Sequence, residues 1–127
     1  MRIFGIGIDV VEVERIARAI RNGGDKFTWR VFTAAERAYC EAQARPELHF
    51  AARFAAKEAV AKALGTGIGK HLAWLDMEVT RGEEGAPRLV LGGAGQEFAA
   101  RHGIREVMIS LSHAQNHAAA NALAVAE

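Results

Sequence analysis

The sequence lacks a second cysteine, a long apolar run, an internal repeat and a low-complexity segment. Because Cys40 is the only cysteine, no intrachain disulfide can form, and we expect a reducing, cytoplasmic compartment. No run of apolar residues approaches the roughly 18 that a membrane-spanning helix requires. Asp9 and Glu12 interrupt the N-terminal apolar stretch, which argues against a secretory signal peptide.

An excess of either charge is also absent, since 16 Lys and Arg residues and 15 Asp and Glu residues give a net charge of +1. Half of the residues are hydrophobic and 24% are charged, which is typical of a soluble globular protein. At 127 residues, the chain is expected to form one domain, residues 1–127. A domain of this size buries about two-thirds of its unfolded surface, so an interface shared between copies would help to stabilise it.

Residues 2–10 alternate as expected of a β-strand. The apolar side chains fall on one face, at Phe4, Ile6, Ile8 and Val10. The other face carries Ile3, Gly5, Gly7 and Asp9, so it is almost bare and ends in a carboxylate. Glycine weakens a strand and often marks a position that another backbone or a ligand approaches closely.

A first helix is expected from about Val11, where apolar residues begin to recur every three or four positions, to the Asn-Gly-Gly sequence at 22–24. The opposite side of this helix carries Arg15, Arg18 and Arg21, which should project into solvent.

Two further helices are expected before residue 65. Thr33 and Glu36 have the spacing of a capping box, which predicts a short helix that ends before Pro46. The next helix covers about 47–64, with Pro46 suited to its first turn and Gly65 to its end.

The remainder of the chain is predicted to be mainly β-structure. Strands are expected at about 73–80, 88–91, 106–112 and 117–125, with a turn at 83–87 and a short helix at about 94–102. The order β-α-α-α-β-β-α-β-β is α+β in class, with an antiparallel-rich sheet. The last strand presents only alanine on one face, at Ala118, Ala120, Ala122 and Ala124.

A face that carries only methyl groups packs closely against a helix or a neighbouring subunit. For the assembled protein we expect the glycine face of the first strand and the alanine face of the last to be covered by another copy of the chain.

Glu58 is unusual because it lies on an apolar stripe of the third helix, in line with Phe50 and Phe54. One interpretation pairs it with Lys62 in an i, i+4 ion pair at the surface, which is a common structural contact. Asp9 likewise has a structural interpretation, as the N-cap of the first helix. Alternatively, Asp9 and Glu58 together bind Mg²⁺, which prefers one or two protein carboxylates and completes its shell with water and phosphate.

Lys57 and Lys62 lie close to Glu58 on the helix, and the glycine-rich loop 65–69 follows. Cations and flexible backbone amides of this kind are what a pyrophosphate needs nearby. Asp9 and Glu58 are far apart in the sequence, so their spacing does not establish that they meet. The constellation suggests a phosphate site without specifying one.

Other motifs are weaker. Segment 65–71 departs from the phosphate loop of NTPases in its spacing, lacks Ser or Thr after Lys70, and follows a helix where a strand is required. His113 and His117 lie across an expected hairpin without a third ligand, which argues against a zinc site. Cys40 is expected to be a packed thiol and Asn116 a turn residue.

Four segments occur in an order that resembles the signature blocks of the bacterial holo-acyl-carrier-protein synthases, the short class of 4′-phosphopantetheinyl transferases. These segments are Gly5–Glu12, Arg53–Ala59 with Lys62, Gly65–Gly69, and Ile109–His113. The resemblance extends from about residue 3 to residue 125. The first two blocks are modestly specific alone and quite specific together, whereas the sequence between blocks, such as 81–93, is not diagnostic.

This resemblance implies a 4′-phosphopantetheinyl transferase-like fold, assembled as a homotrimer with three active sites at subunit interfaces. It also implies a Mg²⁺-dependent, cytoplasmic enzyme of fatty acid biosynthesis. Its partners would be coenzyme A and an acyl carrier protein, with no nucleic acid and no membrane.

The resemblance also assigns roles to individual residues. Asp9 and Glu58 correspond to the Mg²⁺ ligands. Lys62 and the loop of Gly65, Thr66 and Gly67 would hold the phosphates of coenzyme A, with His113 close to them. The helix that carries Arg15, together with Arg18 and Arg21, would face the carrier protein.

In such a reaction, the carrier serine attacks the β-phosphorus of coenzyme A, and adenosine 3′,5′-bisphosphate leaves. Transfer of this kind mainly requires that the reacting groups are positioned and that the developing negative charge is stabilised, here by Mg²⁺ and Lys62. Glu58, His113 and a metal-bound water are all candidates for accepting the serine proton.

Two other functions compete with this one. A binding module could dock the arginine-bearing helix on RNA or an acidic protein, although the near-zero net charge and the lack of an RNA-binding signature argue against it. A different metal-dependent phosphotransferase would act on a small nucleotide. Magnesium-dependent binding of coenzyme A separates the first alternative from the enzyme, and transfer to an apo carrier protein separates the second.

Overall fold

A computed structural model describes the whole chain, residues 1–127, and confirms the α+β class. The elements are β1 (Arg2–Glu12), α1 (Val13–Gly23), α2 (Asp25–Val31), α3 (Ala34–Glu41), α4 (Pro46–Leu64), a 3₁₀ turn η1 (Trp74–Asp76), β2 (Met77–Arg81), β3 (Pro87–Leu91), α5 (Gly93–Arg101), β4 (Ile104–His113) and β5 (His117–Ala126). No helix is long and apolar enough to cross a membrane.

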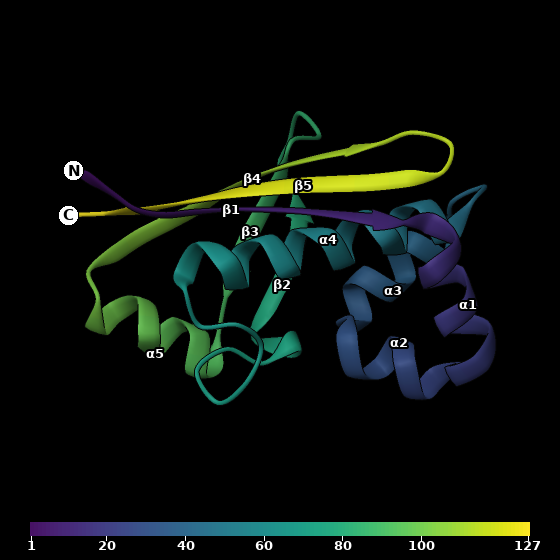
Figure 1. The fold of residues 1–127 in the computed structure, drawn as a ribbon, viewed down its shortest axis with the longest axis horizontal. Coiled ribbons are helices and arrows are strands. Elements are labelled where there is room, and N and C mark those ends of the chain that lie inside the picture. The colour runs from purple at the N-terminus through teal and green to yellow at the C-terminus, as the bar shows by residue number, and fades with distance from the viewer.

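Two antiparallel sheets organise these elements. The larger sheet has the order β1-β5-β4, and the smaller consists of β2 and β3. Helix α4 lies along one face of the larger sheet, with α1, α2 and α3 gathered at one end of the molecule and α5 near the other (Figure 1). The chain ends lie side by side, because Arg2 pairs with Ala126 in the sheet.

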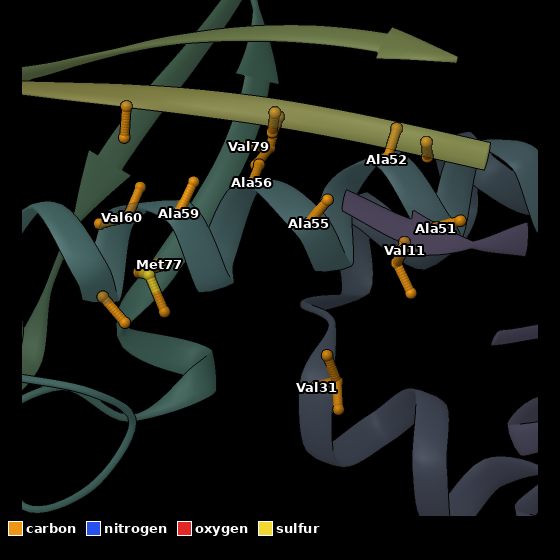
Figure 2. Close-up of a cluster of buried hydrophobic side chains, with 14 of the residues drawn as sticks. Val11, Val31, Ala51, Ala52, Ala55, Ala56, Ala59, Val60, Met77 and Val79 are labelled. Atoms are coloured by element: carbon orange, nitrogen blue, oxygen red, sulfur yellow. The ribbon is translucent and has the colours of Figure 1, made fainter. Parts of the chain in front are cut away.

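The core lies between α4 and the larger sheet, and it is made largely of alanine. Ala52, Ala56 and Ala59 of α4 are buried beneath the sheet (Figure 2). The alanine face of β5, at Ala118, Ala120, Ala122 and Ala124, is buried as well. Small side chains on both surfaces allow the helix backbone to approach the strands closely.

The glycine face of β1 is also turned towards α4. A Cβ added at Gly5 would overlap the carbonyl oxygen of Ala63, and one added at Gly7 would overlap that of Ala59. The interpretation that another backbone approaches these glycines is therefore confirmed. The prediction that another copy covers the glycine and alanine faces is wrong, because α4 of the same chain covers both.

The apolar face of β1 instead points outwards. Ile6, Ile8 and Val10 are 70%, 64% and 61% exposed. Phe4 leaves this face because the register shifts between Ile3 and Gly5, and its ring packs edge-on against Phe98 at 6.4 Å. The outer face of β1 is thus apolar and uncovered within one chain.

Two local features depart from the sequence expectation. Helix α2 was not predicted, and no side chain caps its N-terminus. The alternation at 73–80 begins as the η1 turn, so that the strand itself starts at Met77. By contrast, the capping box is present, since Glu36 N donates to Thr33 Oγ1 and Thr33 N donates to Glu36 Oε1.

Candidate active site

Asp9 lies on the inner face of β1, two residues beyond Gly7. The close contact of Gly7 with α4 brings this part of the strand against the turn that contains Ala59 and Lys62. Asp9 does not cap α1, whose N-cap position is Glu12. The N-cap interpretation of Asp9 is therefore wrong.

Lys62 connects the strand to the helix. Its Nζ donates to Asp9 Oδ1 at 3.2 Å and to the Ile8 carbonyl at 2.9 Å. The surface ion pair between Glu58 and Lys62 that the i, i+4 spacing predicts is absent, because Lys62 pairs with Asp9 instead.

Glu58 lies close enough to Asp9 for the two charges to interact. Burial, and then the negative charge of Asp9, raise the pKa of the Glu58 carboxyl above its ordinary value, while Lys62 and Arg15 act in the opposite direction. The structure thus brings together the two carboxylates that were proposed as metal ligands. The two carboxylates are half-buried, and the positive charges of Lys62 and Arg15 compensate their negative charge only in part. Such a pair fits a hard dication such as Mg²⁺.

An aromatic wall borders Glu58 on the α4 surface. The ring of Phe54 stacks on Trp74 at a centroid distance of 5.2 Å and lies 6.5 Å from Phe27. The guanidinium of Arg15 sits 5.8 Å from the Phe54 ring. Phe27 and Trp74 were not predicted as part of a site, and the apolar stripe through Phe54 was the only signal in the sequence for this surface.

Lys57 does not belong to the phosphate site that the sequence suggested. It is fully buried, and its Nζ donates to Glu36 Oε1 and the Val31 carbonyl at 2.7 Å each, and to the Trp74 carbonyl at 3.3 Å. The second oxygen of Glu36 accepts from Val79 N at 2.7 Å. This buried pair ties four other elements to α4.

The loop after α4 offers phosphate fewer free amides than expected. The N–H groups of Gly65, Thr66 and Gly67 all donate to the Ala61 carbonyl, so they complete the end of the helix. The C-terminal end of a helix dipole repels anions. Any phosphate bound here therefore depends on cations such as Lys62, and on the close approach that the glycines permit.

His113 lies at the end of β4, far from this loop within one chain. Its ring is 5.6 Å from that of His49, in the first turn of α4. Along the helix axis, His49 and Lys62 are about 20 Å apart at roughly 1.5 Å per residue. One chain therefore does not bring His113 and Lys62 together.

The surroundings of His113 form a basic cluster that the sequence analysis missed. The ring of Tyr39 lies 4.4 Å from the guanidinium of Arg53 and 5.4 Å from that of Arg81. Arg53 is only 3% exposed, and its Nε has no hydrogen-bond partner. The available signal was the spacing of His49 and Arg53, which stand four positions apart on one face of α4.

The three arginines of α1 are exposed, as predicted, but they differ in their contacts. Arg21 pairs with Glu14 at 2.8 Å. Arg15 lies over Phe54, beside the carboxylates. Arg18 forms no ion pair or hydrogen bond and lies over no aromatic ring.

Hollows in the single chain lie away from the carboxylates. One of about 520 Å³ is bordered by Glu14, Arg21, Arg45 and His117. Another of about 520 Å³ lies between β3 and β4. Neither is bordered by Asp9, Glu58 or Lys62.

Comparison with known proteins identifies the family to which this chain belongs. The profile of the 4′-phosphopantetheinyl transferase superfamily matches residues 5–122. The holo-acyl-carrier-protein synthase of Chlamydia trachomatis serovar L2 is 44% identical over 122 residues, which cover 96% of this chain and 99% of that protein.

Solved structures of related proteins are similar to this chain along almost its whole length. The holo-acyl-carrier-protein synthase of Neisseria meningitidis superposes with a TM-score of 0.91 at 33% identity, over 98% of this chain and 99% of that one. The Helicobacter pylori enzyme, solved in complex with coenzyme A, gives 0.85 at 32% identity, over 94% and 99%. The chain belongs to the 4′-phosphopantetheinyl transferase superfamily.

Proposed function

We propose that this family member, which transfers the 4′-phosphopantetheine arm of coenzyme A to a serine of an apo acyl carrier protein, does so with Mg²⁺ at a site shared by two copies in a trimer. The observation that carries the proposal is the separation of the two halves of the site. The carboxylates and Lys62 lie near one end of α4, and the basic cluster of Arg53 and His113 lies near the other.

Coenzyme A carries a pyrophosphate and a phosphate monoester on the same ribose. These groups are too close together to reach both ends of α4 in a single chain. With the pyrophosphate at Lys62, the monoester needs a second set of cations. The basic cluster of a neighbouring copy meets that need, because Arg53 is buried there without a carboxylate partner.

The outer face of the larger sheet supports assembly. Ile6, Leu123 and Met108 form an apolar row across the three strands, and in the next row Ile8 lies beside the polar Asn121 and Ser110. An uncovered apolar sheet face of this kind marks an interaction surface. A small domain gains the burial it lacks by covering such a face with copies of itself.

Asp9 and Glu58 would hold Mg²⁺, which would neutralise charge on the pyrophosphate during transfer. Lys62 would donate to the same phosphates once its bond to Asp9 is released. A bond forms between the serine oxygen and the β-phosphorus, and the bond from that phosphorus to adenosine 3′,5′-bisphosphate breaks. The serine proton passes to Glu58, to His113 or to a metal-bound water, which are the groups available at the proposed site.

The exposed helix α1 is proposed to receive the carrier protein, with Arg15 closest to the carboxylates and Arg18 free to meet an acidic helix. Charge complementarity of this kind raises the encounter rate and weakens as salt screens it.

Mass spectrometry of an apo carrier protein incubated with coenzyme A and the purified protein tests the function. We expect the serine to gain one phosphopantetheine arm with Mg²⁺ present and no arm with EDTA. Equal transfer under both conditions would contradict the metal assignment.

Sedimentation tests the assembly separately. The protein should sediment as a trimer, and Ile8→Glu should release monomers by placing a charge on the outer sheet face. An Ile8→Glu monomer with full activity would contradict the shared site. Exposed Glu106→Gln on the same sheet is the matched control and should leave the trimer intact.

A further inference from the structure

His49 lies at the centre of an unbalanced group of positive charges. Its imidazole packs edge-on against Tyr39 at 5.9 Å and against His113 at 5.6 Å. Arg53 stands one turn later on α4, and Arg81 reaches the same tyrosine ring from β2.

The negative charge near this group is small. Glu47, in the turn before His49, is the carboxylate that acts on it, and its Oε1 already accepts from Arg45 Nε at 3.2 Å. No ion pair is formed by Arg53 or Arg81. A buried guanidinium without an anionic partner is unfavourable, because buried charges are normally paired. The group is therefore arranged to accept an anion.

The same surroundings decide the protonation of His49 in the free protein. Burial first, then the charges of Arg53, His113 and Arg81, lower the pKa of His49, and Glu47 opposes them weakly. The imidazole of His49 is consequently harder to protonate than a free imidazole. A phosphate dianion among these groups reverses the local field and favours the imidazolium form.

We propose that His49 is a further ligand of the ribose phosphate of coenzyme A, and that its imidazole takes up one proton from solvent as that phosphate binds. This rests on the proposed function, which places the phosphate monoester at the basic cluster. His49 and Arg53 stand at i and i+4 on one face of α4; Arg53 Nη1 donates to the His49 carbonyl at 3.5 Å, while its Nε is left without a partner. No covalent bond changes, since the proton enters from water and leaves again with the phosphate.

The coupling between protonation of His49 and binding of the phosphate fixes the direction in which affinity changes with pH. The pKa of His49 is lowered in the free protein and rises when the anion binds, so affinity falls as pH increases through that interval. Uptake of one full proton weakens the complex by at most about tenfold per pH unit, and a fractional uptake weakens it by correspondingly less.

Calorimetric titration of the intact protein with adenosine 3′,5′-bisphosphate tests the proposal, in two buffers of different ionisation enthalpy. His49→Phe keeps an aromatic ring against Tyr39 and His113 while removing the titrating group. His102→Phe is the matched control, because its ring packs on Phe98, away from the cluster, at 4.2 Å. The protonation of the ligand itself is common to all three proteins and cancels in the comparison.

We expect the wild type and His102→Phe to take up more protons than His49→Phe, and to lose more affinity as pH rises, by at most about tenfold per pH unit. Adenosine 5′-monophosphate, which lacks the 3′-phosphate, should show no difference between wild type and His49→Phe. Equal proton uptake by wild type and His49→Phe, with tight binding in both, would overturn the role of His49.

A different result would overturn the placement of the phosphate itself. If His113→Ala and His49→Phe both bound adenosine 3′,5′-bisphosphate as tightly as the wild type at every pH, the cluster would not hold the monoester. Transfer to the carrier protein is measured independently by mass spectrometry. The proposed function and the role of His49 can therefore fail separately.

Discussion

Lys62 pairs with Asp9 on the neighbouring strand, at 3.2 Å, and not with Glu58 one turn earlier on its own helix. The carboxylate of Glu58 is therefore left half-buried beside a second carboxylate without a direct cationic partner. An arrangement of this kind is unfavourable for folding but suited to a bound cation.

Removing either carboxylate tests whether Asp9 and Glu58 bind Mg²⁺. We expect Asp9→Asn and Glu58→Gln each to lower kcat about 100-fold or more, because each removes a ligand of the charge that stabilises transfer. Calorimetry should show that Mg²⁺ binding weakens in both variants, while circular dichroism stays unchanged. Glu84→Gln, an exposed carboxylate in the turn between β2 and β3, is the control. Full activity of either site variant at low magnesium would remove the metal assignment.

Glu58 should also make stability depend on pH when metal is chelated. Its pKa is raised in the folded protein, so the folded state binds more protons and stability falls as pH rises through the region above the unfolded pKa of about 4.3. In EDTA, Glu58→Gln should therefore have a higher Tm than the wild type at pH 7, and the gap should close near pH 4. A gap that does not change with pH would contradict the raised pKa.

The face of β1 that packs inside shows the limit of prediction from sequence. Alternation identified the strand and its two faces, yet an apolar face normally marks the core, and here Ile6, Ile8 and Val10 are exposed. The decisive fact is that α4 lies against Gly5 and Gly7, and the pairing of a strand with a distant helix is not encoded in local periodicity. The same applies to Asp9 and Glu58, whose meeting the family resemblance predicted and spacing did not.

Helix α2 and Lys57 show why the remaining features were missed. The α2 sequence, rich in β-branched and aromatic residues and without a capping side chain, has weak helix propensity, so its helix depends on burial of Thr28 and Val31. Lys57 looks like a surface cation in the sequence. Only the tertiary structure reveals that Glu36 reaches it from α3.

The approach of β1 to α4 predicts a glycine-specific effect. Gly7→Ala places a methyl group against the Ala59 carbonyl and should lower the free energy of unfolding by about 3 kcal/mol, while moving Asp9 away from Glu58. Gly69→Ala should change the free energy of unfolding by less than about 1 kcal/mol, because no atom lies within 4 Å of the added Cβ. Urea denaturation of both variants compares them, and equal stabilities would contradict the packing.

The buried pair of Lys57 and Glu36 predicts non-additive destabilisation. Lys57→Met leaves the Glu36 carboxylate unpaired and should reduce the free energy of unfolding by about 3–5 kcal/mol. Adding Glu36→Gln should recover part of this loss, because the remaining charge disappears while the amide can still accept from Val79 N. A double variant that loses the sum of the two single effects would show that the pair is not coupled.

The most direct test of the shared site is to co-express two inactive variants with different affinity tags and purify mixed trimers. Glu58→Gln disables the carboxylate half, and His113→Asp repels phosphate from the basic half. In every mixed trimer, one of the three sites combines two intact halves, so we expect about a third of wild-type transfer by mass spectrometry, far above either variant alone. Mixed trimers no more active than the separate variants would contradict a site built from two copies.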